Sequence, residues 1–212
     1  MATYESVIKI TGAVGDLVFY NLNGKNVVRK KSGFNKTAFK KSPSYEKVRQ
    51  NSSEFGHCSK MGKIIRKSLE SYIKEAGDPL LYQKFAKLMT SIKDLDKISE
   101  RGKRTVGNGL KTEEGKKLLR EFQMGAIQNV SDCVRIQDQM LYKNEKCFSD
   151  QTLFIIIKLD SEKYITESAE EIITWNKEQE SLFKKYFSKD DLLLHFMVLK
   201  NKKNEITHMG FV

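Results

Sequence analysis

The stretch from Ser42 to Ala76 constrains the fold most, because apolar residues recur along it with helical spacing. Ser42 and Pro43 are typical of a helix start, and the run Gly77-Asp78-Pro79 is typical of a helix end. At about 100° per residue, the apolar side chains of this stretch fall in a single arc. We therefore predict one long helix over residues 44–76 with one face in a core, formed by Phe55, Cys58, Met61, Ile65, Leu69, Tyr72, Ile73 and Ala76.

The opposite side of the predicted helix is cationic. Five basic residues fall within about 60° of each other on that side: Arg49, Lys60, Lys63, Lys67 and Lys74. The chain has 212 residues and a net charge of +11, and residues 25–74 alone hold 14 basic and 3 acidic side chains. A positive field concentrated in this way attracts polyanions. A lysine-rich surface that serves solubility alone is the competing interpretation.

Residues 4–31 alternate in the manner of β-strands around a two-residue Asn23-Gly24 turn. This turn places Tyr20 opposite Val27 and Phe19 opposite Val28, so both faces of the hairpin are apolar and we expect both to be covered. Residues 30–41 are predicted to be a loop of mixed cations and aromatics: Lys30, Lys31, Phe34, Lys36, Phe39, Lys40 and Lys41. Such mixtures bind single-stranded nucleic acid. The alternative is that the two phenylalanines anchor the loop to the core.

A second helix is predicted from Pro79 to Ile98, since apolar residues recur there at spacings of four and three. The short break before it predicts an antiparallel helical hairpin, in which Gly62 allows close approach of the two backbones. Residues 99–111 form a basic glycine-rich segment, yet they lack the G-x4-G-K-[ST] pattern of a phosphate-binding loop. Thr112 is then expected to cap a short helix over residues 113–122.

The charge balance changes after residue 123, which predicts a division into a basic domain, residues 1–123, and a mainly β domain, residues 124–212. Residues 152–159 are predicted to form a buried strand, and residues 192–199 and 205–212 a hairpin in which we expect Leu199 to pair with Ile206. Residues 167–187 fit either a helix or a strand. Both faces of the hairpin are apolar, so a neighbouring subunit is expected to cover one face if the chain itself supplies no second layer.

Catalytic and metal-binding patterns are sparse. Cys58, Cys133 and Cys147 are widely spaced without a CxxC pair, which argues against a disulfide scaffold or zinc knuckle and indicates a reducing compartment. His195 and His208 share a face of the predicted hairpin without a third ligand in reach, so the sequence predicts no metal site. We expect no enzymatic activity, no cofactor, no membrane association and a cytoplasmic location, or one within a virion-like particle.

Several segments resemble an uncharacterised family of small bacterial proteins. The similar segments are IKITGAVGDLVFY, VVRKKSG and SPSYEKVRQNSSEFGHCSKMGKIIRKSL, with a weaker similarity in LLLHFMVLKNKKNE. The resemblance implies an N-terminal β-hairpin, a helical pair and a β-rich C-terminal part. It implies no activity, ligand or catalytic residue.

The sequence therefore predicts an α+β fold in which an N-terminal β-hairpin and an antiparallel helical hairpin precede a β-rich, sandwich-like C-terminal part. We expect a non-enzymatic basic protein that binds nucleic acid or another polyanion through the cationic side of helix 44–76. The alternative is a structural or assembly subunit of a particle or mobile element that self-associates through its C-terminal half.

Overall fold

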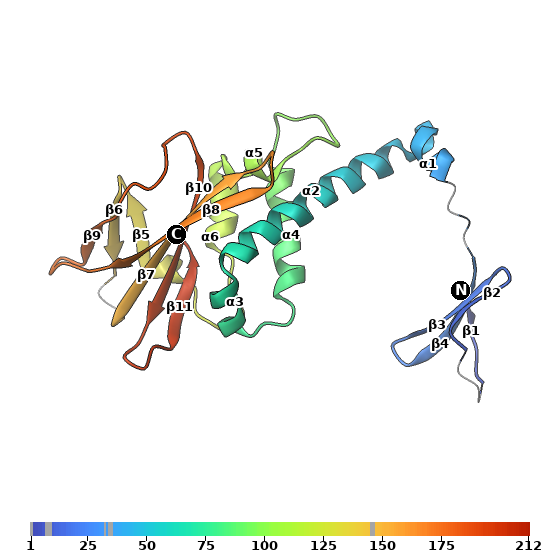
Figure 1. Cartoon of the computed structure of the whole chain (residues 1–212), viewed down its shortest axis with the longest axis horizontal. Helices are drawn as coiled ribbons and strands as arrows, with labels where there is room; N and C mark the ends of the chain where they lie inside the picture. The colour runs from blue at the N-terminus through green and yellow to red at the C-terminus, as the bar shows by residue number, and fades with distance from the viewer. Residues whose placement is uncertain (1, 7–9, 32, 34–35, 145–146) are drawn as a thin grey trace. The chain divides into compact units, whose positions relative to one another are not determined.

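The computed structural model describes residues 2–6, 10–31, 33, 36–144 and 147–212 (Figure 1). The first strands and helices are β1 (Ala2–Thr3), β2 (Gly12–Val14), β3 (Leu17–Leu22), β4 (Lys25–Lys30), α1 (Lys36–Lys41), α2 (Glu46–Ser68), α3 (Glu70–Ala76), α4 (Leu81–Asp94), α5 (Val106–Leu110) and α6 (Glu113–Arg120). Next come β5 (Val134–Gln137), β6 (Met140–Lys143), β7 (Gln151–Asp160), β8 (Ile165–Ile173), β9 (Glu180–Leu182), β10 (Leu192–Lys200) and β11 (Ile206–Phe211). Two short 3-10 helices are Pro43–Tyr45 and Val130–Asp132. The fold is mixed α+β, as predicted.

The chain divides into two compact units, residues 1–46 and 47–212. The division predicted at residue 123 falls inside the second unit, because one apolar core there contains side chains from both sides of that position. Met61, Phe85 and Leu119 lie on the N-terminal side of residue 123, and Ile157 and Phe211 lie on the C-terminal side. The change of charge balance near residue 123 therefore marks a change of surface and does not separate two cores.

The first unit is an antiparallel sheet with strand order β1-β4-β3-β2. The Asn23-Gly24 turn has positive φ at both residues, and it aligns Tyr20 with Val27 and Phe19 with Val28, as predicted. Val27 is buried, and the ring of Tyr4 packs edge-on against that of Phe19. The predicted cover of both faces is incomplete, because Val14, Leu17 and Leu22 are all exposed.

The helices of the second unit begin with an antiparallel pair. Cys58 lies beside Met89, Gly62 lies beside Phe85, and the Arg66 guanidinium is 4.3 Å from the centre of the Tyr82 ring. The residue numbers increase along α2 while those of their partners decrease along α4, so the two helices are antiparallel. Figure 1 shows α2 crossing α4 and extending past it. The predicted helical hairpin is present, and Gly62 lies at the close approach.

The predicted single helix over residues 44–76 is two helices, α2 and α3. Leu69 between them has φ −117° and ψ 17°, outside the helical region, and its side chain is fully buried. Tertiary packing has therefore overridden helical spacing here. Two neighbouring details also differ from prediction. The Phe55 side chain is 62% exposed, although Glu54 and Cys58 in the same turn are buried, and α4 ends at Asp94, which leaves Ile98 exposed.

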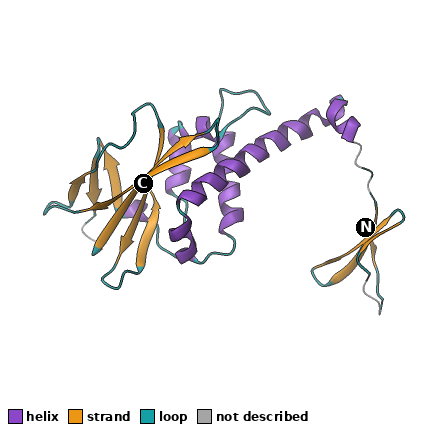
Figure 2. Ribbon diagram, in the orientation of Figure 1, coloured by secondary structure: helices purple, strands orange, loops and turns teal. Residues whose placement is uncertain are grey.

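The centre of the second unit is an antiparallel sheet with strand order β11-β10-β7-β8, and helices cover one of its faces (Figure 2). Alternate residues of β7, such as Ile155 and Ile157, pack on that side with the helices. Phe154 and Ile156 pack on the other side in a second cluster that includes Leu141 of β6. The small sheet β5-β6-β9 contributes to that second cluster, so sheet packs on sheet there, while helices cover the opposite face.

The C-terminal hairpin has the predicted faces but not the predicted register. Leu199 pairs with His208 and Lys200 with Ile206, with a register shift between Leu199 and Lys200. This irregularity adds one residue to β11. A register predicted from regular alternation therefore assigns the wrong partner to Leu199. The ambiguous segment 167–187 contains no helix: it supplies part of β8 and all of β9. Both faces of β10 are covered within the chain: the Tyr72 ring of α3 packs against Phe196 on one side, and Phe183 and Phe187 belong to the cluster on the other side.

Two glycines give opposite expectations for substitution by alanine. A Cβ on Gly109 in α5 would lie 1.9 Å from the Ile92 carbonyl oxygen, so Gly109→Ala forces α4 and α5 apart and is expected to lower the free energy of unfolding by about 1 to 3 kcal/mol or more. Gly56 in α2 has no atom within 4 Å of such a Cβ, so Gly56→Ala is expected to raise it by about 0.5 to 1 kcal/mol. Urea unfolding of both variants measures the difference, and equal effects would contradict the close α4–α5 packing.

Candidate polyanion-binding surface

The cationic face of α2, which we define as Lys60, Lys63 and Lys67, is a real feature of the structure. All three side chains are exposed on one continuous helix. Lys60 lies 4.8 Å from the centre of the Tyr164 ring, which favours a defined position for its ammonium group. Arg49 is half-buried on an earlier turn of the same helix. Four of the five predicted helix cations therefore belong to one element.

The fifth predicted cation, Lys74, does not belong to this face. It lies on α3, beyond the break at Leu69, and its ammonium group is 2.9 Å from the Glu70 carboxylate. This pair is exposed and contributes little to stability, but it reduces the positive charge that Lys74 offers to a partner. Helical spacing had grouped Lys74 with the others because nothing in the sequence marks the break.

The side of α2 and α3 next to the sheet is fixed against β8. Ser68 Oγ donates a hydrogen bond to Thr166 Oγ1, and Tyr72 Oη donates one to Glu170 Oε2. These bonds hold the helices in place along the edge strand of the sheet. The cationic face therefore belongs to a rigid framework, and its three ammonium groups are spaced by about one turn of helix.

The predicted site residues of the first unit lie apart from this face in the sequence and belong to another compact unit. Lys30 ends β4 and Lys31 follows it, both exposed, while Lys40 and Lys41 are exposed in the last turn of α1. Residues 36–41 are thus helical, where a loop was predicted. The Phe39 ring is half-buried and contacts the Tyr45 ring edge-on at 5.7 Å, which favours anchoring over base stacking. Phe34 lies outside the described residues.

The basic glycine-rich segment surrounds carboxylates of the protein itself. The Arg104 guanidinium donates to both oxygens of the buried Glu54, at 2.8 and 2.7 Å, and the Gly102 amide donates to the same carboxylate. Lys93, also buried, lies 2.8 Å from Glu54. Arg104 holds the pKa of Glu54 at about 2 against the opposing effect of burial, with Lys93 and Gly102 assisting.

Asp96 has the same role at the other end of this segment. Its carboxylate accepts hydrogen bonds from the amides of Ile98, Ser99 and Thr105 and from the Asn108 side chain. These bonds lower the pKa of Asp96 although burial acts in the opposite direction. The amides that resemble a phosphate cradle are therefore already used by an internal anion, which gives the physical reason that this segment is not a phosphate-binding loop.

His57 is a structural residue. The Val106 amide donates to His57 Nε2 at 2.9 Å, so Nδ1 carries the proton and donates to Tyr164 Oη at 2.9 Å. Burial lowers the pKa of His57, which keeps the ring neutral. The neighbouring Cys58 thiol points into the core and donates to the Met89 carbonyl oxygen. The two side chains therefore serve different contacts.

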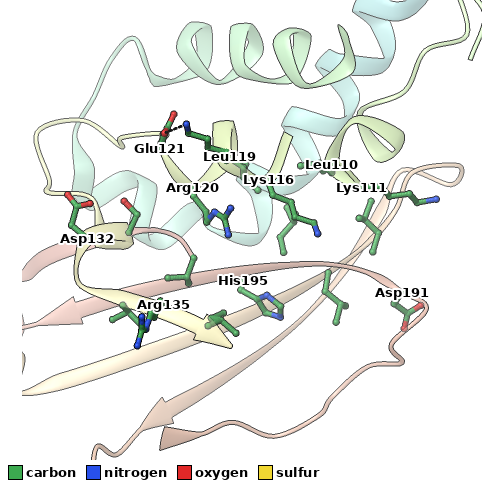
Figure 3. Close-up of a pocket in the computed structure, with 18 of the residues that line it drawn as sticks. Leu110, Lys111, Lys116, Leu119, Arg120, Glu121, Asp132, Arg135, Asp191 and His195 are labelled. Carbon is green, nitrogen blue, oxygen red and sulfur yellow. Dashed lines mark ion pairs between the residues drawn. The ribbon is translucent and has the colours of Figure 1, made fainter. Parts of the chain in front are cut away.

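A cavity of about 810 Å³ lies between α6, β5 and the first residues of β10 (Figure 3). Arg120 on α6 and Arg135 on β5 line it, and within the described ranges neither guanidinium has an ion-pair partner. Lys116 also lines it, but it is paired with Glu113. His195 lines the cavity from β10, and burial lowers its pKa to about 4, so its ring is neutral near pH 7. Glu121, Asp132 and Asp191 line the cavity as well, so its lining carries both signs of charge with an excess of cations, which favours an anionic group.

The structure brings together two cysteines that no local sequence pattern pairs. Cys133 and Cys147 form a disulfide, with 5.6 Å between their Cα atoms. The expectation of no disulfide is wrong, because strand pairing around residues 134–143 returns the chain to its starting point. His208 lies beside the pair, and His195 does not, since the real register of β10 and β11 places His208 opposite Leu199.

No helix in the described ranges combines the length and apolar character that a bilayer span requires. Comparisons with protein-family models, with curated proteins and with solved structures find no match to this chain.

Proposed function

We propose that this protein is a non-enzymatic binding protein that engages a polyanion, nucleic acid in the first place, through the cationic face of α2. The observation that carries the proposal is the exposure of Lys60, Lys63 and Lys67 on one rigid helix. Among the described residues no carboxylate is within ion-pair distance of these three ammonium groups. Regularly spaced ammonium groups of this kind contact successive phosphates of a backbone and carry little sequence preference.

The distribution of ion pairs supports this choice. Glu54, the buried acid of α2, is engaged by Lys93 and Arg104 within the core, so it does not offset the exposed lysines. The exposed cations of α2 therefore act outward as a group. The cavity lined by Arg120 and Arg135 is a separate place for an anionic group, and a small ligand suits it better than an extended polymer.

Reversal of the three charges tests the proposal. The triple variant Lys60→Glu, Lys63→Glu, Lys67→Glu is expected to lose most of its affinity for a fluorescent DNA duplex. The slope of log K against log salt should become less steep by about 3, since each phosphate contact contributes roughly 0.9 to that slope. Fluorescence anisotropy over a series of salt concentrations measures both quantities.

The matched control reverses three exposed lysines elsewhere, Lys177→Glu, Lys202→Glu and Lys203→Glu, with the same change in net charge. This control should keep the wild-type slope. A loss of equal size in both variants would show that net charge alone drives binding, and an unchanged slope in the α2 variant would remove this face from the site. Wild-type protein without affinity for DNA or RNA at low salt would overturn the proposed function.

Self-association through the C-terminal half stays a prediction. An uncovered face of the C-terminal hairpin does not support it, because Met197 and Phe196 are both fully buried on opposite faces. Light scattering of the full chain after nuclease treatment distinguishes the two functions, since an assembly subunit remains large and a nucleic-acid-binding monomer does not.

A further inference from the structure

Three metal-binding side chains meet at the end of the small sheet, although they are far apart in sequence. Cys133 follows the 3-10 helix Val130–Asp132, Cys147 precedes β7, and His208 lies in β11. The two sulfur atoms and one ring nitrogen of His208 all lie within 4.8 Å of one another. Two thiolates and an imidazole are a common ligand set for Zn²⁺.

The hydrogen bonds of His208 favour the tautomer that a metal requires. The Thr207 hydroxyl donates its proton to the Leu199 carbonyl oxygen at 3.1 Å. The same hydroxyl oxygen is 3.1 Å from His208 Nδ1, so it accepts the Nδ1 proton. Nε2 is then unprotonated and has a free lone pair. This bond is the outer contact that typically orients a metal-binding histidine.

The backbone around the cysteines is also fixed. The Cys133 amide donates to the Val130 carbonyl, the Asn144 amide donates to the Cys133 carbonyl, and the Cys147 amide donates to the Asn144 carbonyl. Cys133 is buried beside Val130 in the second core cluster. His208 is held by its pairing with Leu199 and by a bridge to Gln128. None of these contacts involves the S–S bond itself.

We propose that Cys133, Cys147 and His208 form a Zn²⁺ site when the two cysteines are reduced. A thiol reductant supplies two electrons and two protons, which breaks the S–S bond and gives two thiols while the reductant becomes a disulfide. Binding of Zn²⁺ then releases the two thiol protons and forms two Zn–S bonds and one Zn–N bond. Among the described residues no fourth side chain of these types joins the cluster, so water completes the coordination. The disulfide and the zinc complex are alternative states of one site.

Cobalt and zinc titrations of the full chain test this site. The variant Cys58→Ser removes the buried free thiol and leaves the two cysteines of the site. After reduction with a phosphine and its removal under nitrogen, this variant should bind one Co²⁺ with the charge-transfer absorption of cobalt–thiolate bonds, and Zn²⁺ should displace the cobalt. The same protein with its disulfide intact should show no such absorption.

Three variants and one control variant in the Cys58→Ser background separate a ligand set from an accidental cluster. Cys133→Ser should abolish the cobalt–thiolate absorption. His208→Ala should also abolish it, or should weaken metal binding more than Thr207→Val does. Thr207→Val keeps the ligands but removes the partner of Nδ1, and it should weaken Zn²⁺ about 10- to 100-fold. His195→Ala, the matched control, should leave the titration unchanged. A reduced protein that binds no cobalt, or binds it equally well without His208, would overturn the proposal.

Discussion

Replacing Glu54 with glutamine is expected to lower the free energy of unfolding by about 3 to 5 kcal/mol. The Glu54 side chain is 3% exposed, and it lies 2.8 Å from the Lys93 ammonium group, which is also buried. Glutamine keeps the shape of the side chain but removes its charge, so Lys93 and the Arg104 guanidinium lose their buried acidic partner and keep only Asp94, whose side chain is half exposed. A buried cation without a full counter-charge costs about this amount. Urea unfolding near pH 7 measures the change.

The control for this prediction is Glu70→Gln, which removes an equally short ion pair on the surface. Glu70 and Lys74 are both well exposed, so this substitution is expected to change the free energy of unfolding by less than about 1 kcal/mol. If the two substitutions had similar effects, burial would not be what makes the Glu54 cluster important.

The difference in stability between wild type and Glu54→Gln is expected to depend on pH. The pKa of Glu54 is about 2 in the folded protein and close to 4.5 in the unfolded chain, so the carboxylate stabilises the fold at pH values above its unfolded pKa. That contribution is lost as the pH falls from about 4.5 to about 2. The stability difference between wild type and Glu54→Gln should therefore be constant near neutral pH and shrink through this acidic range.

Leu69→Ala is expected to lower the free energy of unfolding by about 2 to 5 kcal/mol. Leu69 is fully buried at the break between α2 and α3, in the core that joins these helices to the sheet. Truncation to alanine removes the isopropyl group beyond the Cβ and leaves a cavity in this core. Lys63→Ala, an exposed substitution six residues earlier, should change stability by less than about 0.5 kcal/mol. A Leu69→Ala value as small as this would mean that the core is assigned wrongly.

Local chemistry made several parts of the fold predictable. The Asn23-Gly24 turn has few alternatives for a two-residue hairpin, so the pairing of Tyr20 with Val27 follows from it. Thr112 accepts a hydrogen bond from the Gly115 amide, as expected of a helix cap. Gly77 ends α3 in the left-handed conformation, as expected of the residue after a helix. In each case a few neighbouring residues determine the outcome.

Features that depend on distant contacts were not predictable from spacing. Leu69 lies within a regular apolar stripe, so the spacing shows no sign of the break. Only the burial of Leu69 in the core shared with the sheet explains why α2 ends there. The division of the chain likewise depends on a core that spans residue 123. The register shift after Leu199 adds one residue to a strand whose alternation looks regular.

The candidate site was predictable to a similar extent. Helical periodicity located the cationic face of α2, because exposure on a helix follows from the angle alone. It misplaced Lys74, and it could not show that Phe39 packs on Tyr45. The meeting of Cys133, Cys147 and His208 left no local signal, since their approach requires two hairpins and the pairing of β10 with β11.

The first core of the second unit has a consequence for folding during synthesis. Its helices present Met61, Phe85 and Ile92 to strands that end with Phe211, about 120 residues after Ile92. At about 5 to 20 residues per second, the ribosome needs on the order of 10 s to deliver those strands. During the first part of that time no strand covers the apolar side of the helical pair, and after β7 and β8 have emerged the sheet still lacks β10 and β11. The nascent chain is therefore a natural client for chaperones that bind exposed apolar segments, until β10 and β11 emerge and close the core.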